Sequence, residues 1–172
     1  MADRDPLENP EPLIRRVYAY VAYRIGDGAD AEDVTSATFE RALRYRHTFD
    51  QKRGQPASWL LGIAGRCLSE YYATRPTPVS HVPDVPAPGE LAGESAARLD
   101  LRRAVAMLPG RDAELIALRY GADLTAKQIA EVTGMRTNAV EVALHRALGT
   151  LRGVLETGQP PARASSRLRA VE

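Results

Sequence analysis

The polar residues with the clearest chemical potential lie at the start of an expected helix that runs from residue 137 to about 155. In chain order they are Arg136, Thr137, Asn138 and Glu141. Such side chains donate hydrogen bonds to phosphates or read base edges. The cluster predicts contact with a nucleic acid.

The elements that must position this cluster are two short helices joined by a tight turn. Thr125 and Gln128 have the spacing of a capping box, which starts the first helix. Gly134 suits the turn between the helices, because glycine tolerates a positive φ. Thr137 is expected to cap the second helix, whose buried stripe is Val140, Leu144, Leu148 and Leu151. The Ala130, Gly134 and Val140 spacing is typical of a helix-turn-helix, although a plain antiparallel helix pair could share it.

Other kinds of chemistry find no support in the sequence. Cys67 is the single cysteine and lies on an apolar stripe, which indicates a packing thiol. His47, His81 and His145 have no metal-ligand spacing. The glycines match neither a phosphate-binding loop nor a dinucleotide fingerprint, and no serine has a nucleophile-elbow context. We therefore expect no enzyme activity, no metal site and no cofactor.

Composition excludes several classes of protein. The 172 residues include 23 Lys plus Arg and 22 Asp plus Glu, which gives a net charge of +1. This balance argues against a polybasic protein that holds nucleic acid by charge alone. A single cysteine excludes an intrachain disulfide, and no apolar run approaches the roughly 20 residues that span a bilayer. The acidic N-terminus does not resemble a signal peptide. We expect a cytoplasmic protein.

Hydrophobic spacing predicts an all-α fold of two small helical domains joined by an extended Pro-rich linker. Five prolines between residues 76 and 88 exclude a regular helix there. A long surface loop is the alternative, but loops of this length are uncommon within one compact domain. The expected segments are a disordered N-terminus (1–10), a first domain (11–75), an acidic linker (76–97), a second domain (98–156) and a disordered tail (157–172).

The first domain is expected to contain three helices. Leu13, Val17, Val21 and Ile25 recur every four residues on a helix that ends near Gly26. Asp30 is expected to cap a second helix, which runs to about His47. A third helix begins near Pro56, and its apolar positions follow a 3-4-3-4 spacing. These positions are Leu60, Ile63, Ala64, Cys67, Leu68 and Tyr71.

The chain resembles a bacterial sigma-70-family factor of the extracytoplasmic-function (ECF) type over about residues 11–155. DAEDVTSATFERAL and FDQKRGQPASWLLGIAGRCLSEYY are similar to sigma region 2, and LPGRDAELIALRYGADLTAKQIAEVTGMRTNAVEVALHRALGTLR is similar to region 4. The resemblance implies that region 2 binds the β′ clamp helices of RNA polymerase and helps to open the promoter −10 element. It implies that region 4 binds the β flap and reads the −35 element. The function expected is promoter recognition for core RNA polymerase, with an anti-sigma factor as a further possible partner.

The resemblance assigns residues to each surface. Those on the polymerase-binding helix are Asp30, Glu32, Asp33, Phe39 and Arg41, although the acidic group could simply cap the helix. Those near the −10 element are Arg53, Ser58, Trp59, Arg66 and Ser69, with Trp59 either anchored in the core or stacked on DNA. Ser58, Arg66 and Ser69 are expected on the outer face of the third helix. The −35 residues are Arg111, Arg119, Arg136, Thr137, Asn138, Glu141, His145 and Arg146. Among them, Arg136 and Asn138 lead for direct DNA contact, and Arg111 and Arg119 each have a solvated surface charge as the alternative. His145 lies one helical turn after Glu141, so an intrahelical pair is its alternative.

The sequence also departs from the family pattern. Ser36 and Ala37 replace a usual Gln-Glu pair, and Gly62 and Gly65 stand where arginine is frequent. In the recognition helix, Glu141 and Ala143 replace common basic residues, and each lost cation removes a possible phosphate contact. Two alternatives therefore remain: a stand-alone helix-turn-helix regulator, and an adaptor that kept the fold without the DNA contacts.

Overall fold

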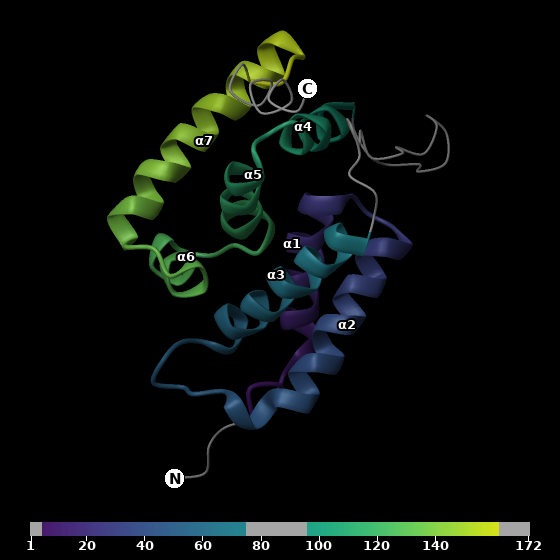
Figure 1. The fold of residues 1–172 in the computed structure, drawn as a ribbon, viewed down its shortest axis with the longest axis vertical. Coiled ribbons are helices and arrows are strands. Elements are labelled where there is room, and N and C mark those ends of the chain that lie inside the picture. Colours follow the sequence, from purple (N-terminus) through teal and green to yellow (C-terminus); the bar gives the residue numbers. More distant parts are fainter. Residues whose placement is uncertain (1–4, 75–95, 162–172) are drawn as a thin grey trace.

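The computed structural model describes residues 5–74 and 96–161, and regular structure within these ranges is helical throughout (Figure 1). The N-terminal helices are α1 (Pro10–Ile25), α2 (Ala29–Tyr45) and α3 (Pro56–Thr74), with a short 3-10 turn, η1 (Arg46–Thr48), after α2. The C-terminal helices are α4 (Ala96–Ala106), α5 (Gly110–Ile116), α6 (Ala126–Thr133) and α7 (Thr137–Thr157), with a wide turn, η2 (Ala117–Gly121), after α5. The all-α prediction is confirmed.

Most of the Pro-rich linker expected over 76–97 lies outside the described residues, as does most of the expected tail. Ala96 and Ala97, the last two residues of that segment, begin α4. Thr157 closes α7, so the first residue of the expected tail is helical. His81 also lies outside the described residues.

The N-terminal helices pack around one another through the apolar stripes that the sequence predicts. Their fully buried side chains include Val17 and Val21 from α1 and Leu60 and Ala64 from α3. The end of α1 is set by Gly26, which has a positive φ of 89°. Cys67 is buried on this stripe, as expected.

Two predicted helix caps are wrong. Gly28, with φ 126°, precedes α2, and no side chain caps that helix. Asp30 instead lies in the first turn of α2, where its carboxylate accepts a hydrogen bond from the Tyr71 hydroxyl at 2.9 Å. Arg136 is the N-cap residue of α7, and Thr137 is the first residue of the helix rather than its cap. In both places the helix begins at or before the residue expected to cap it, at Ala29 and at Thr137, so Asp30 and Thr137 already belong to the first helical turn and do not occupy the N-cap position.

The capping box at α6 is confirmed in full. The Thr125 hydroxyl accepts a hydrogen bond from the Gln128 amide, and the Gln128 side chain accepts one from the Thr125 amide at 2.9 Å. Gly134 follows α6 in the left-handed conformation, with φ 71°. This turn brings α7 back against α6 and completes the expected helix-turn-helix.

The buried stripe of α7 differs from the prediction at one position. Val140, Leu144 and Leu151 are buried, but Leu148 is exposed and Ala147 is buried in its place. The reason is the second half of α7, which packs on α4 and α5 through Ala147, Leu151 and Val154. A 4-3-4-3 spacing keeps these residues on one helical face, and Leu148 falls beside it.

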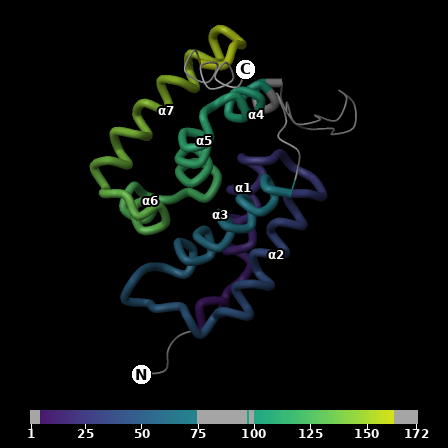
Figure 2. Tube along the Cα trace, in the orientation of Figure 1, coloured from purple at the N-terminus to yellow at the C-terminus, as the bar shows by residue number. Residues whose placement is uncertain are grey.

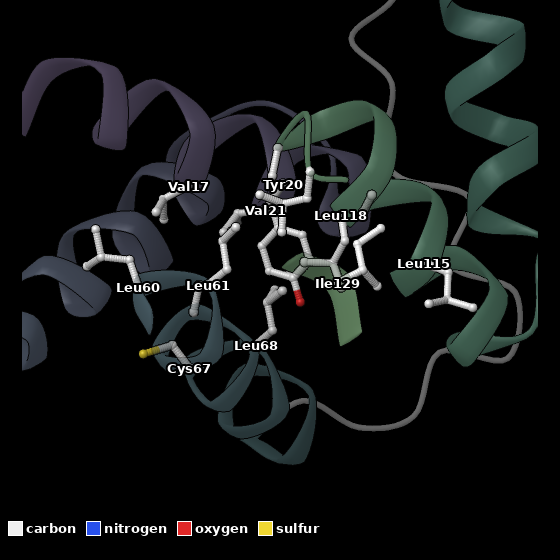
Figure 3. Packing of buried hydrophobic residues seen from close by; sticks show 14 of the residues in the cluster. Val17, Tyr20, Val21, Leu60, Leu61, Cys67, Leu68, Leu115, Leu118 and Ile129 are labelled. Carbon is white, nitrogen blue, oxygen red and sulfur yellow. The ribbon is translucent and has the colours of Figure 1, made fainter. Parts of the chain in front are cut away.

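The N- and C-terminal helices share one continuous core. Figure 3 shows Tyr20 of α1 between Leu61 and Leu68 of α3 and Leu118 and Ile129 of the C-terminal helices, and all five side chains are buried. Helix α5 ends at Ile116, and the wider turn η2 packs against α1. At the end of that turn, a Cβ on Gly121 would lie 3.0 Å from Cδ2 of Tyr23 and 3.1 Å from the Ala19 carbonyl oxygen. Any larger residue at this position would force α1 to shift by a few tenths of an ångström, so glycine suits this close approach.

Polar contacts cross the same boundary. Nη1 of Arg24 donates a hydrogen bond to the Gly110 carbonyl at 2.6 Å, and Arg102 pairs with Asp27 at 2.7 Å. Arg24 also lies over the Tyr72 ring, 5.8 Å from its centroid. The two halves therefore form one packed body in this conformation.

Candidate nucleic-acid interface

The N-terminal turns of α7 present an open polar face. Arg136, Asn138, Glu141, His145 and Arg146 are all exposed, as a reading surface requires. A surface hollow brings part of this set together with Arg111 from α5. It is lined by Arg111, Met135, Arg136, Thr137, Asn138, Ala139, Val142, Ala143 and Arg146. The structure thus gathers residues from α5 and α7 that lie about 25 positions apart in the sequence.

Val142 is a residue that the sequence analysis missed. It lines the same hollow and is 61% exposed, although its side chain is fully apolar. An apolar side chain on a DNA-facing helix can contact the methyl group of thymine. Its position off the Val140 and Leu144 stripe is the sequence signal that could have found it.

Arg111 and Arg119 have different surroundings. Arg111 is exposed and lines the α7 hollow. Arg119 is half-buried, and its Nη1 donates a hydrogen bond to the Leu124 carbonyl at 2.7 Å. This contact holds the chain segment that enters α6, so Arg119 supports the helix-turn-helix from behind.

A second groove lies between α3, the loop before it and α6. Four residues that the sequence assigns to −10 contact line it: Arg53, Ser58, Trp59 and Arg66. Thr48, Phe49, Asp50, Gly54, Gln55, Gly62 and Ile63 complete its N-terminal walls, and Glu131 and Val132 of α6 also line it. Ser69 is exposed, lies outside the groove and donates a hydrogen bond to the Gly65 carbonyl.

The aromatic pair at this groove is partly structural. Phe49 is buried, and its ring meets the Trp59 ring edge to face, with centroids 5.6 Å apart. Trp59 is half-buried, so one part of its ring is fixed by Phe49 while the residue still lines the groove. Both interpretations of Trp59 fit this position.

The sequence predicted Ser58 on the outer face of α3, and this prediction is wrong. Ser58 is buried and lies at the inner edge of the groove. Its residue is 6% exposed, and its Oγ has no hydrogen-bond partner among the described residues. Burying a hydroxyl without a partner is costly. A group that is buried, unpaired and at the wall of a groove is suited to bind a ligand atom that enters it.

The predicted polymerase-binding residues separate into paired and open groups. Glu32 and Asp33 are exposed on α2, Phe39 is half-buried, and Asp30 is engaged by Tyr71. Arg41 forms two hydrogen bonds with the Glu70 carboxylate of α3, one at 2.8 Å. The guanidinium lowers the pKa of Glu70, and the carboxylate raises the pKa of Arg41. Arg41 therefore joins α2 to α3 at the surface.

Within residues 5–74 and 96–161, no three His, Cys, Asp or Glu side chains come close enough to hold a metal ion. Nor does any helix in the part of the chain that the structure describes have the length and apolar character needed to cross a bilayer.

Two family models match the chain, one over each half. Residues 11–75 match the family model described as Sigma-70 region 2, and residues 98–151 match that described as Sigma-70, region 4. The ECF RNA polymerase sigma factor SigD of Mycobacterium tuberculosis is 30% identical over 166 residues, which cover 87% of this chain and 74% of that protein. The chain belongs to the sigma-70 family. The N-terminal helices are its region 2, and the C-terminal helices are its region 4.

Other relatives carry the same description. BldN of Streptomyces coelicolor, an ECF RNA polymerase sigma factor, is 31% identical over 147 residues. The match covers 81% of this chain and 56% of BldN, so this sigma-70-family chain spans little more than half of that relative.

Two solved structures share the fold. The sigma factor RpoE of Bartonella quintana, in complex with the anti-sigma factor NepR, matches with a TM-score of 0.61 at 18% identity. The match covers 86% of this chain and 94% of the RpoE chain. CnrH, in complex with the cytosolic domain of CnrY, matches with a TM-score of 0.59 at 24% identity. The match covers 86% of this chain and 82% of the CnrH chain. At these identities the likeness concerns the fold.

Proposed function

We propose that this protein is a promoter-specificity subunit that binds core RNA polymerase, directs it to specific promoters and helps to open the −10 element. The observation that carries the proposal is the pair of separate polar surfaces, one on each sigma region. The α7 face offers exposed Arg136 and Asn138, and the α3 groove offers Arg53 and Arg66 beside an unpaired buried hydroxyl.

Region 4 would read duplex DNA. An exposed N-terminal helical turn fits the major groove, where arginine and asparagine pair with base edges. Arg111, at the rim of the same hollow, suits a phosphate contact. Glu141 adds a negative charge to the face, so we expect modest affinity for DNA when the chain is alone.

Region 2 would hold an unpaired strand. A base taken out of the duplex needs stacking surfaces and polar edges to offset the cost of unstacking. Trp59 supplies an aromatic surface, Ser58 a hydroxyl, and Arg53 and Arg66 supply positive charge for the backbone.

Polymerase contact would involve the exposed acidic residues of α2. Glu32 and Asp33 are free to meet basic groups on the β′ clamp helices, whereas Arg41 acts by holding α2 against α3. The outer side of α7, where Leu148 and Leu155 are exposed, is available to the β flap. Two structures with this fold are complexes, one of them with a named anti-sigma factor, so such a partner is also proposed here. The protein is not itself an enzyme, needs no cofactor and acts in the cytoplasm beside polymerase.

The test is run-off transcription on genomic DNA fragments by core polymerase, with and without the protein. New start sites are expected only when both are present. Arg136→Ala and Asn138→Ala should each reduce initiation several-fold, because a good base contact is worth about 1–3 kcal/mol. Arg152→Ala, an exposed arginine near the other end of α7, is the matched control and should leave initiation unchanged.

The alternatives give different results. A stand-alone regulator would bind a palindrome tightly as a dimer without polymerase. An adaptor would act on polymerase equally well after Arg136 and Asn138 are replaced. An absence of new start sites with the wild-type chain would contradict the proposal.

A further inference from the structure

Arg119 lies in a different place from the other arginines near the α7 face. Arg111 and Arg136 line the hollow at the start of α7, whereas Arg119 is not among its lining residues. Arg119 is half-buried on η2, and its Nη1 donates a hydrogen bond to the Leu124 carbonyl at 2.7 Å. The guanidinium therefore contacts the chain segment that leads into α6.

Leu124, the last residue before the N-cap of α6, is attached to η2 through both of its backbone polar groups. Its amide donates a hydrogen bond to the Leu118 carbonyl at 3.1 Å, and its carbonyl accepts the one from Arg119. Its side chain is fully buried. The preceding residue, Asp123, has a φ of 53°, which is uncommon for a residue other than glycine. These contacts hold the chain in a sharp turn immediately before α6.

The peptide group between Leu124 and Thr125 joins this turn to the helix cap. Its carbonyl accepts the hydrogen bond from Arg119, and its N–H donates to the Gln128 side chain at 2.9 Å. Because hydrogen bonds are directional, a peptide group engaged on both sides has a fixed plane. The direction in which α6 leaves the turn is therefore fixed by Arg119 on one side and by the capping box on the other.

The direction of α6 decides where the α7 face lies. Figure 2 shows the trace running from α5 through this turn into α6, and α6 and α7 pack against each other. Ile129 of α6 and Val140 and Leu144 of α7 are buried in one cluster. Direct readout of a base pair needs donors and acceptors at hydrogen-bond distance and angle to the base edges. A small tilt of α6, carried to α7, would therefore lower the discrimination between base pairs.

We propose that Arg119 is a positioning residue for −35 recognition: it sets the orientation of the helix-turn-helix through the Leu124 carbonyl and makes no contact with DNA. The inference rests on the proposed function, because it takes the α7 face as the surface that reads the −35 element. It changes the role of Arg119 from a DNA contact, which the resemblance implies, to the control of base discrimination by residues that do touch DNA.

Binding to promoter DNA separates these roles. The probes are a labelled duplex carrying a start site that the wild-type chain gives with core polymerase, and a copy changed at one base pair of its −35 element. Affinity for both is measured with core polymerase and each variant over a range of salt. Arg119→Met keeps a long side chain but removes the donors. It should reduce the preference for the matched duplex several-fold and leave the slope of log affinity against log salt unchanged.

Two arginines serve as matched comparisons. Arg111→Met removes a proposed phosphate contact, so it should weaken both duplexes equally and reduce the salt slope by about one. Arg152→Met, at an exposed site near the other end of α7, should change neither the preference nor the slope. If Arg119→Met behaves like Arg111→Met, Arg119 contacts a phosphate and the proposal is overturned. If only the fraction of active protein falls, Arg119 merely stabilises the fold and the proposal is again wrong.

A second variant covers a failure to fold. Arg119→Lys keeps the positive charge for a phosphate contact but lacks the planar guanidinium that meets the carbonyl. The proposal predicts a loss of preference with an unchanged slope, whereas a phosphate contact predicts no change in either.

Amide hydrogen exchange of the free chain gives a readout without DNA or polymerase. Replacing Arg119 should speed exchange several-fold in α6, because its first turn loses one of its two anchors, and should leave exchange in α3 unchanged. Unchanged exchange in α6 would contradict the positioning role. If the wild-type chain gives no start sites, the proposed function fails, while the exchange rates still decide whether Arg119 holds α6 in place.

Discussion

At the scale of single residues, Ser58 shows how burial changes the interpretation of a side chain. Its position on α3 fits the helix that reads the −10 element, but its hydroxyl points to no partner within the described chain and is shielded from water. Thr38 is the opposite case: it is also buried, but its hydroxyl donates a hydrogen bond to the Val34 carbonyl at 2.8 Å. The two hydroxyls should therefore respond differently to removal.

Ser58→Ala should leave the free energy of unfolding unchanged or raise it by up to about 1 kcal/mol, because it removes an uncompensated polar group. Thr38→Val should lower it by about 1 kcal/mol, since it removes a hydrogen bond that is made. Urea unfolding of the three proteins measures both effects. The same Ser58→Ala variant should reduce promoter opening, and a loss of stability comparable to that of Thr38→Val would show that Ser58 has a partner.

Tyr20 predicts a pH dependence. Burial, and next the charge of Glu114, raise the pKa of its hydroxyl above the ordinary value of 10.0. Above about pH 10 the unfolded chain loses this proton while the folded chain keeps it, so the folded state binds more protons and stability falls as pH rises. Below that pH the contribution is fully present.

Tyr20→Phe should therefore flatten the decline of the thermal midpoint between about pH 9 and pH 11. Tyr45→Phe, on an exposed ring of α2, serves as the control and should keep the wild-type slope. An unchanged slope in Tyr20→Phe would argue against Tyr20 as its source.

At the scale of elements, the helix-turn-helix is largely determined locally. The capping box of Thr125 and Gln128 begins α6, and Gly134 ends it, so both boundaries of the short helix follow from side chains that the sequence displays. A helix of 8 residues is too short to be stable alone, so its ends contribute a large share of its order.

Thr125→Ala should cost about 1 kcal/mol, because it leaves helix amides without a partner. Thr125→Ser keeps the hydroxyl and should lose much less. Thermal unfolding measures stability, and initiation at promoters should weaken in parallel in Thr125→Ala as α6 frays and the support of α7 is lost. Equal stability of the two variants would show that the cap contributes little.

At the scale of the whole molecule, the shared core joins regions that the sequence presents as separate. Gly121 is the narrowest point of that junction, because the backbone of α1 lies against it. Gly149, on the exposed side of α7, has no atom within 4 Å of the place where a Cβ would stand. Substitutions at Gly121 and Gly149 therefore distinguish a steric clash at the boundary from a general effect of replacing glycine.

Gly121→Val should destabilise the packed body by about 1–3 kcal/mol, since the added carbons overpack the junction. Small-angle X-ray scattering should also show a larger radius of gyration. Gly149→Val should preserve both values. A Gly121→Val chain with the wild-type stability and radius of gyration would mean that the junction accommodates the larger side chain.

The sequence by itself determined the helices and the helix-turn-helix, because these depend on residue spacing along the chain, and its resemblance to the sigma-70 family assigned the two sigma regions. The spacing of apolar residues sets the buried face of each helix, and Thr125, Gly134 and Pro56 act on the backbone within a few residues of themselves. Their effects on helix boundaries can therefore be predicted from the sequence. The burial of Ser58, the exposure of Leu148 and the pairing of Arg41 depend instead on which helix lies opposite. Each follows from neighbours distant in sequence, such as Glu70 for Arg41. Only the tertiary structure showed that regions 2 and 4 share a core and that Glu131 lies at the −10 groove, since contacts between two separately patterned domains leave no periodic signal in either one.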